Sequence, residues 1–235
     1  MIAKTLQDIN VTFDVQSDSR DKDPDYASAT LKSYHQLLWS KPLPNGEVMQ
    51  LETGKDCYLK WNGIFLGSDS ITATFRNGRN KHFEEFKKGI PNYEEYEKEN
   101  LSKLYTIGGA IIFPQTHWSM NRARGCHPRI CDRWDLTLEC IRRYYAGEHS
   151  PLDKSLMESK QFFDLFVGFK SYADFFLLQD CVDDSYNVKF WLDTPLFESE
   201  PMPKTLEAYL AWVQTQLDFA AKRNKRIEEY INSIE

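Results

Sequence analysis

The chain has 235 residues, of which 41% are hydrophobic and 14% aromatic, and its net charge at pH 7 is −6. This much apolar material excludes a disordered chain, and the acidic balance excludes a protein that coats nucleic acid with its whole surface. The chain has no run of about 20 apolar residues, which excludes a transmembrane helix, and its N-terminus indicates no signal peptide. We therefore expect one soluble, cytoplasmic domain over residues 1–235, with its five cysteines as free thiols.

The first 115 residues are predicted to be rich in β-strands. Residues 9–15 alternate apolar and polar side chains and indicate a short strand, whereas the apolar spacing of residues 26–39 indicates a helix. Asn62-Gly63 separates two apolar runs and predicts a hairpin over 57–66, because both residues tolerate positive φ. Residues 68–75 fit either a strand or the start of a capped helix.

The chain from residue 83 onward alternates helical patterns with a single buried strand. Residues 104–113 predict that strand, bent at Gly108-Gly109 and ended by Pro114. Residues 115–129 are predicted to form a loop. Helices are expected over 83–104 in pieces, 130–145, 152–169, 172–181, and from the capping residue Thr205 to about Ile231. The predicted fold class is α+β, with a strand-rich N-terminal half (about 1–115) packed against a helical C-terminal half (about 116–235).

The chemical signal is concentrated in residues 121–145, which hold six arginines and no lysine. Arginine grips phosphate or carboxylate with a rigid two-pronged fork, whereas lysine is a hydrated point charge, so a run of arginines alone indicates that geometry matters. The loop before the expected helix and the N-terminus of that helix together form a place where an anion can dock. The ligand-binding residues predicted here are Asn121, Arg122, Arg124, Gly125, Arg129, Arg133, Arg142 and Arg143.

The helix expected over 130–145 has one polar and one apolar face. At about 100° per residue its three carboxylates fall within one arc together with Arg142 and Arg143. A carboxylate beside arginines can act as a general base or hold a metal. The predicted catalytic residues are Asp132, Asp135 and Glu139.

The same residues fit a structural ion-pair network equally well, since Glu139 stands at helical spacing from both Arg142 and Arg143. Arg122 and His127 have the spacing of an arginine–histidine pair used by some helical ribonucleases. A weaker zinc hypothesis groups Cys126, His127, Cys131 and Cys140, with or without His117. Ser68, Asp69 and Ser70 with Thr72 and Thr74 fit a polar pocket or an ordinary alternating strand.

The chain resembles an uncharacterised family of small bacterial proteins from about Tyr58 to its C-terminus. The resemblance transfers no activity and no cofactor. The residues that carry it are Gly108-Gly109, Phe113-Pro114, Asn121, Arg124-Gly125, Asp132-Arg133, the run from Asp135 to Tyr145, and Ser150-Pro151-Leu152. A looser likeness to ADP-ribosyltransferases lies in the Ser68-Asp69-Ser70 segment, although the chain lacks the glutamate motif of that class.

Two functions follow from these patterns. The first is an enzyme acting on a nucleotide or nucleic-acid phosphate, by phosphodiester hydrolysis or by nucleotidyl or ADP-ribosyl transfer; a bacterial defence or toxin system is a setting by analogy. The alternative is a non-catalytic module that binds an anionic small molecule, a nucleic acid or a protein partner. No metal ligand set is assigned, and the cofactor and the oligomeric state are unknown.

Overall fold

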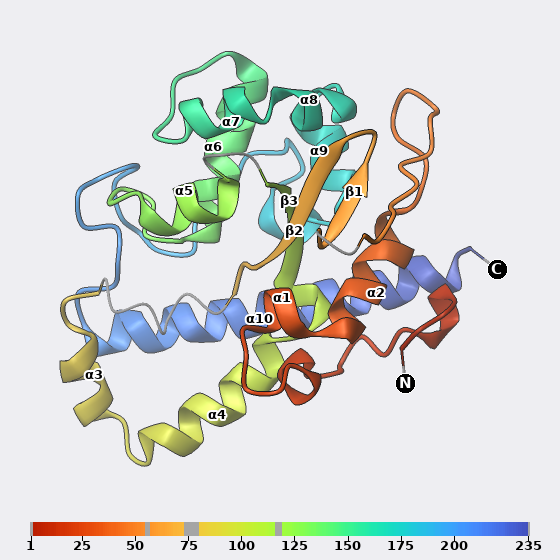
Figure 1. Ribbon diagram of the computed structural model, residues 1–235. Coiled ribbons are helices and arrows are strands. Elements are labelled where there is room, and N and C mark those ends of the chain that lie inside the picture. Colours follow the sequence, from red (N-terminus) through yellow and green to blue (C-terminus); the bar gives the residue numbers. More distant parts are fainter. Residues whose placement is uncertain (1, 55–56, 73–79, 116–118, 235) are drawn as a thin grey trace.

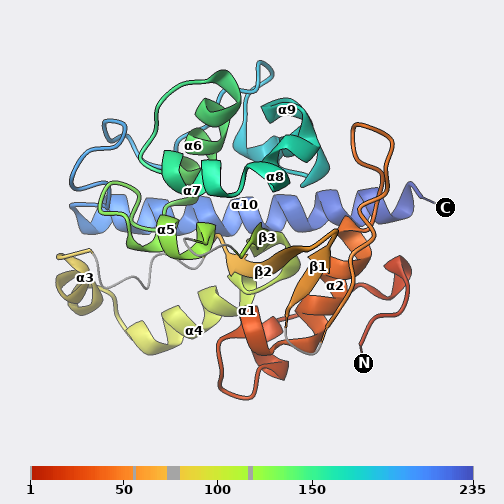
Figure 2. The same cartoon turned by 45° about the horizontal axis from the view of Figure 1, so that its top comes forward.

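The computed structural model describes residues 2–54, 57–72, 80–115 and 119–234. Its longest element is the C-terminal helix α10 (Leu206–Asn232), which runs along the length of the molecule (Figure 1). The helix begins where Thr205 accepts a hydrogen bond from the backbone N–H of Ala208 at 3.2 Å, as the sequence predicted. Helices α6 to α9 lie on one side of α10, and the sheet lies with helices α1, α2 and α4 on the other (Figure 2).

The sheet is small and antiparallel, with strand order β1-β2-β3. The strands are β1 (Leu59–Trp61), β2 (Ile64–Ser70) and β3 (Ala110–Pro114). Asn62 and Gly63 both have positive φ in the turn between β1 and β2, which confirms the predicted hairpin. Ser68 pairs with Ile112 and Ser70 with Ala110, so the polar end of β2 lies beside the start of β3.

The prediction of a strand-rich N-terminal half is wrong. The described part of residues 1–115 contains only these three strands, and helices occupy more of it. They are α1 (Pro24–Ala27), α2 (Ala29–Trp39), α3 (Phe83–Gly89) and α4 (Tyr93–Leu104), with 3₁₀ turns η1 (Leu6–Asp8) and η2 (Val15–Asp18). The alternating segment 9–15 forms turns, because Asp14 caps η2 through the N–H of Gln16 while Val11 and Val15 reach the core. The fold is a mixed one, with a small sheet embedded among helices.

The C-terminal half is helical, as expected, but its boundaries differ. The expected loop contains a short helix α5 (Met120–Cys126), capped by Ser119 and continuing through Gly125. The helix expected from residue 130 begins four residues later. The remaining elements are α6 (Trp134–Ala146), α7 (Asp153–Glu158), α8 (Lys160–Phe163), η5 (Asp164–Phe166), α9 (Phe169–Phe175) and η6 (Gln179–Cys181). Residues 187–192 form no strand and contribute one isolated bridge, Val188 to Val182.

The strand predicted over 104–113 with a bend at Gly108-Gly109 is shorter than expected: Leu104 ends α4, the glycines lie in the turn η4 (Ile107–Gly109), on which α10 packs, and β3 begins only at Ala110. A Cβ atom on Gly108 would lie 2.6 Å from the backbone oxygen of Ala220 in α10. A Cβ on Gly109 would lie 2.0 Å from the backbone oxygen of Leu104. Gly108 therefore lets the turn η4 approach α10 closely, and Gly109 lets the same turn lie against the end of α4.

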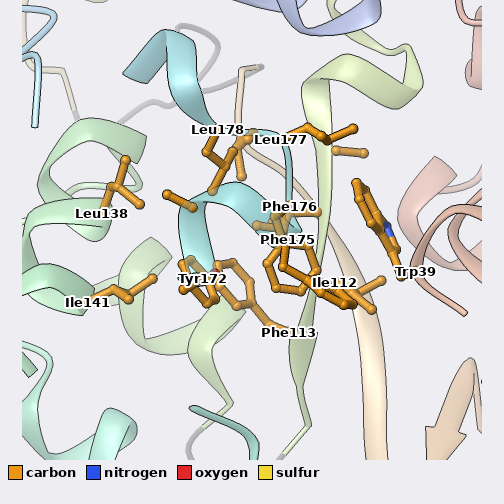
Figure 3. Packing of buried hydrophobic residues seen from close by; sticks show 14 of the residues in the cluster. Trp39, Ile112, Phe113, Leu138, Ile141, Tyr172, Phe175, Phe176, Leu177 and Leu178 are labelled. Carbon is orange, nitrogen blue, oxygen red and sulfur yellow. The ribbon is translucent and has the colours of Figure 1, made fainter. Parts of the chain in front are cut away.

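The apolar core lies between β3, α2, α6 and α9. Figure 3 shows Ile112 and Phe113 of β3 with Trp39 on one side and Phe176, Tyr172 and Leu138 on the other. No helix in the described part of the chain is long and apolar enough to cross a bilayer.

Candidate functional site

A polar pocket of about 590 Å³ lies where the segment before α1, the end of β2 and the turn before α6 meet. It brings together residues that are more than 100 positions apart in the chain. Lys22 is the one cationic side chain among the described lining residues. We call this site the carboxylate pocket and define it by its five aspartates, Asp21, Asp23, Asp25, Asp69 and Asp132.

Asp25 is the most enclosed of these carboxylates and is held by β2. One oxygen accepts a hydrogen bond from the Ser68 hydroxyl at 2.9 Å, and the other accepts one from the backbone N–H of Ser70 at 3.1 Å. The residue lies at the second position of α1, where Pro24 and the capping carboxylate of Asp23 fix the backbone. Asp25 therefore has a single orientation, set by two elements.

A chain of hydrogen bonds behind Asp25 has a fixed direction. The Trp39 indole N–H donates to Nδ1 of His35 at 2.9 Å, and Nε2 of His35 lies 3.0 Å from Oγ of Ser68. Burial and then the positive charge of Arg223 lower the pKa of His35 to about 3, so the ring is neutral. Because its Nδ1 is an acceptor, its proton is on Nε2, which donates to Ser68 and leaves the Ser68 hydroxyl to donate to Asp25. The serine is a donor to a carboxylate and not the nucleophile of a Ser-His-Asp triad.

Asp69 and Asp132 share the fully buried guanidinium of Arg124. Nη1 of Arg124 lies 2.8 Å from Asp69 and 2.5 Å from Asp132, and Nη2 donates to the backbone oxygen of Asp132. Nε donates to the Thr137 hydroxyl at 3.2 Å. The guanidinium is therefore fully engaged from inside the protein, and it fixes the two carboxylates rather than offering a fork to a ligand.

The two buried carboxyls of the carboxylate pocket titrate far from their ordinary range. Burial raises the pKa of Asp25 to about 7, and the negative charge of Asp23 adds to this effect. Burial also raises the pKa of Asp69 to about 8, with the attraction of Arg124 opposing the shift and Asp132 supporting it. A carboxyl that titrates near neutral pH can act as an acid or a base in catalysis. The two groups interact, so these values belong to the pair.

The predicted site residues divide among four places. The expected polar arc of a continuous helix over 130–145 does not form, because Cys131 and Asp132 have positive φ and precede α6. Asp132 therefore turns toward Arg124 and the carboxylate pocket, away from Asp135. Of the predicted catalytic residues, Asp132 alone lines that pocket.

Arg133 and Asp135 form an ion pair that is entirely buried. Arg133 also donates to Thr194 and to the backbone oxygen of Pro201, and Asp135 accepts from the N–H of Trp191 at 2.9 Å. The pair thus fastens the long connection between η6 and α10 to the start of α6.

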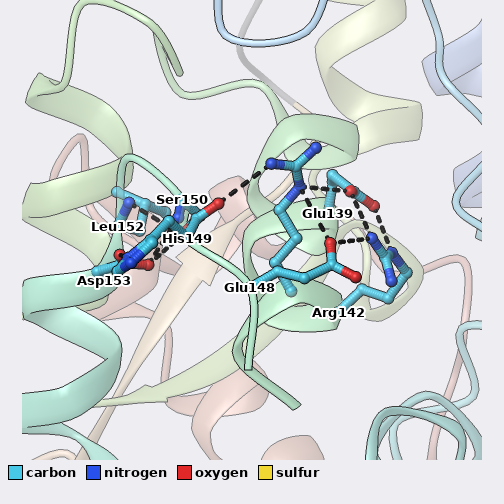
Figure 4. A network of polar contacts seen from close by, with 8 residues as sticks. Glu139, Arg142, Glu148, His149, Ser150, Leu152 and Asp153 are labelled. Carbon is cyan, nitrogen blue, oxygen red and sulfur yellow. Dashed lines mark hydrogen bonds and ion pairs between the residues drawn. The ribbon is translucent and has the colours of Figure 1, made fainter. Parts of the chain in front are cut away.

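Glu139, Arg142 and Arg143 form a third cluster, from the middle of α6 toward its C-terminal end. Figure 4 shows Glu139 and Arg142 beside Glu148. Both arginines bond the Glu139 carboxylate at 2.8 Å, and Arg142 also reaches Glu148 at 3.0 Å. Burial acts to raise the pKa of Glu139, but the hydrogen bonds from Arg142 and Arg143 outweigh it and lower the pKa. We call Glu139, Arg142, Arg143 and Glu148 the α6 network.

The remaining predicted residues lie on or near α5. Asn121 donates to the backbone oxygen of Ser68 at 2.6 Å and so fastens α5 to β2. Arg122 and Arg129 are exposed, and Gly125 is part of the helix rather than of a loop. His127 ends α5, and Arg122 precedes it by more than one turn.

The zinc hypothesis is not supported by the placement of its cysteines. Cys126 is exposed whereas Cys140 is buried within α6, and His117 lies outside the described residues. Across the described ranges, no group of three His, Cys, Asp or Glu side chains has the arrangement needed to hold a metal ion.

Sequence reasoning missed Asp25, Asp23 and His35, and it gave Asp69 as a member of either a polar pocket or an alternating strand; Asp69 and Ser70 do line the carboxylate pocket. A local signal existed in Asp23-Pro24-Asp25, where proline at the first helical position predicts a capped helix carrying two carboxylates. The contact between Ser68 and Asp25 spans 43 positions, however, and no local pattern encodes it.

Comparison with known proteins gives a family but no activity. No curated protein and no solved structure matches the chain. The model of a family of unknown function, DUF6994, matches residues 9–227, which is nearly the whole chain. The chain therefore belongs to the DUF6994 family.

Proposed function

We propose that the carboxylate pocket is the active site of an enzyme that acts on a nucleotide or nucleic acid by acid–base chemistry. The observation that carries the proposal is the pair Asp25 and Asp69, which face one pocket and have pKa values of about 7 and 8. Near neutral pH such a pair contains one protonated and one ionised carboxyl, so an acid and a base are present together. Bond cleavage by water or a hydroxyl requires both.

The roles follow from the hydrogen bonds. Asp69 uses one oxygen for Arg124, and its other oxygen has no hydrogen-bond partner among the described residues. That oxygen is the one placed to accept a proton from an attacking water or hydroxyl. The Asp25–Asp69 pair then returns the proton to the leaving group, while Arg124 and Asp132 hold Asp69 in place.

A nucleotide suits the chemistry around the pocket better than a simple anion does. Tyr26 follows Asp25 in α1 and is 62% exposed, and partial burial together with the negative charges of Asp23 and Asp69 raises its pKa. An exposed ring stacks on a base, and carboxylates accept hydrogen bonds from ribose hydroxyls. Lys22 supplies positive charge for a phosphate.

The test compares two carboxylate variants of one protein. Wild type, Asp69→Asn and Glu139→Gln are incubated with ATP, NAD⁺, ADP-ribose, and short RNA and DNA, and the products are separated by chromatography. We expect turnover of at least one substrate, a loss of about 100-fold or more in Asp69→Asn, and a change of less than about threefold in Glu139→Gln.

Equal losses in the two variants would contradict the assignment of the site. Nucleotide binding without turnover, retained in Asp69→Asn, would instead favour the non-catalytic binding module.

A further inference from the structure

The hydrogen-bond chain behind Asp25 joins α2 to β2 and is buried along its whole length. His35 and Trp39 lie one turn apart in α2, Ser68 lies in β2, and all three residues are inaccessible to solvent. The indole N–H of Trp39 lies 2.9 Å from Nδ1 of His35. Nε2 of His35 lies 3.0 Å from Oγ of Ser68, which lies 2.9 Å from a carboxyl oxygen of Asp25. We call Trp39, His35 and Ser68 the His35 chain.

The chemistry of the donors leaves one arrangement of protons in the His35 chain. An indole N–H only donates, so Nδ1 of His35 accepts, and the single proton of the ring lies on Nε2. A proton on Nδ1 would set two N–H groups against each other at 2.9 Å. Because Nε2 donates to Oγ of Ser68, the hydroxyl hydrogen of Ser68 has Asp25 as its acceptor in the described part of the chain.

This arrangement limits where Asp25 holds a proton. A carboxylate has about four lone-pair sites on its two oxygens. The Ser68 hydroxyl occupies a site on one oxygen, and the backbone N–H of Ser70 occupies a site on the other. Ser68 cannot accept the proton of Asp25 instead, because its own hydrogen would then point at the N–H of His35. The proton therefore lies on one of the remaining sites of a side chain that lines the carboxylate pocket.

We infer that His35 and Trp39 are positioning residues, which make Asp25 the acid that donates a proton to the leaving group in the carboxylate pocket. The inference rests on the proposed function and assigns one role within it. As the bond to the leaving oxygen or nitrogen breaks, that atom keeps the electron pair and takes the proton of Asp25. Asp69 takes a proton from the attacking water or hydroxyl, so the two carboxyls exchange protonation states and no oxidant or reductant is needed.

Two variants of His35 separate positioning from packing. The side chain of glutamine offers a donor and an acceptor, as neutral imidazole does, whereas leucine offers neither. In His35→Leu the Ser68 hydroxyl is free to accept the proton of Asp25, and this stabilises the protonated carboxyl. Carbon-13 NMR of the side-chain carboxyls measures the titration midpoint of Asp25. We expect that midpoint to rise by at least about 0.5 pH unit in His35→Leu and to change by less than about 0.3 in His35→Gln.

The sign of the shift distinguishes lost positioning from a loosened fold. Water that enters a loosened site solvates the ionised carboxyl, and the midpoint of Asp25 then falls toward its ordinary value of about 4. Both variants keep the other charged or titratable groups that act on Asp25, which are Asp23, Tyr26, Tyr58, Asp69 and Arg124. A rise in His35→Leu that is absent from His35→Gln therefore reports the hydrogen bond to Ser68.

Nitrogen-15 NMR of the wild-type chain measures the tautomer of His35 directly. We expect one neutral form with its proton on Nε2 from about pH 5 to about pH 9. A proton on Nδ1 overturns the inference, and so does a midpoint of Asp25 that is unchanged or lower in His35→Leu, or equally raised in His35→Gln. If His35→Leu does not fold, the wild-type tautomer and the midpoint in His35→Gln decide.

Turnover separates this inference from the proposed function. If Asp25 is the acid, kcat/KM falls as the pH rises through the midpoint of Asp25, and this fall moves to higher pH in His35→Leu. A fall that stays in place while the NMR midpoint rises overturns the role of Asp25 and leaves the active site where it was proposed. Absence of turnover by wild type contradicts the proposed function itself, and with it the role of Asp25 as an acid.

Discussion

The carboxylate pocket and the α6 network both contain carboxylates that contact arginine, but the pKa values of their carboxyls shift in opposite directions. In the carboxylate pocket five aspartates lie together, the buried Arg124 contacts only Asp69 and Asp132, and the pKa values of Asp25 and Asp69 rise. In the α6 network two arginines hold Glu139, and its pKa falls. The comparison shows that the ratio of acids to arginines, rather than the presence of both, decides whether the pKa of a buried carboxyl rises or falls.

The largest expected effect belongs to the ion pair Arg133–Asp135. This pair has one acid for one arginine, and both side chains are fully buried. Asp135→Ala should lower the free energy of unfolding by about 3–5 kcal/mol, because it leaves the buried Arg133 without its carboxylate. Urea unfolding at pH 7 measures this. The double variant Arg133→Met with Asp135→Leu should recover much of the lost stability. A cost below about 1 kcal/mol in Asp135→Ala would show that the ion pair does not anchor the connection before α10 to α6.

The carboxylate pocket and the α6 network should change the free energy of unfolding in opposite directions as the pH rises. The pKa of Asp69 is raised in the folded chain, so its contribution is fully present below the unfolded value near 4 and is lost as the pH rises through about 8. Wild type should therefore be less stable at pH 8 than at pH 5 by about 1–3 kcal/mol from the pocket. Asp69→Asn should reduce the dependence of the unfolding free energy on pH. An equal dependence in wild type and variant would show that the pKa of Asp69 is not raised by folding.

In the α6 network stability should change with pH in the opposite direction. The pKa of Glu139 is lowered, so its stabilisation is present above the unfolded value near 4.5 and is lost as the pH falls below it. Glu139→Gln should cost about 1–2 kcal/mol at pH 7 and less at pH 3. A cost of the same size at pH 3 would mean that packing, and not charge, holds Glu139.

The smallest effect concerns the helix that carries Arg124. Gly125 lies within α5, and a Cβ there would meet only Asp132 Oδ1, at 3.9 Å. Gly125→Ala should stabilise the chain by about 0.5–1 kcal/mol and leave the pH dependence of the pocket unchanged. Destabilisation would show that the carboxylate pocket tolerates no added atom beside Asp132.

Local features of the fold were predictable from sequence. The Asn62-Gly63 hairpin and the Thr205 cap each depend on residues within a few positions, and each is present. The strand content was not predictable, because the alternation over 9–15 arises from capped turns. Side-chain hydrogen bonds there replace the ladder that an alternating pattern suggests.

The site was predictable only in part, since Arg124 and Asp132 belong to it and Asp135 and Glu139 do not line it. The helical projection assumed a continuous helix, and the positive φ at Cys131 and Asp132 breaks that assumption. Asp25 meets β2 through tertiary packing of α1 and cannot be placed by any local spacing.

A carbon-13 NMR titration of the side-chain carboxyls tests whether Asp25 and Asp69 titrate near neutral pH. This measurement requires no knowledge of the substrate. Assignment comes from comparing wild type with Asp25→Asn and Asp69→Asn. We expect two coupled carboxyl titrations with midpoints near pH 7 and 8, alongside Glu139 titrating below its ordinary value. Midpoints of about 4 for both aspartates, the ordinary range of an exposed carboxyl, would contradict the account.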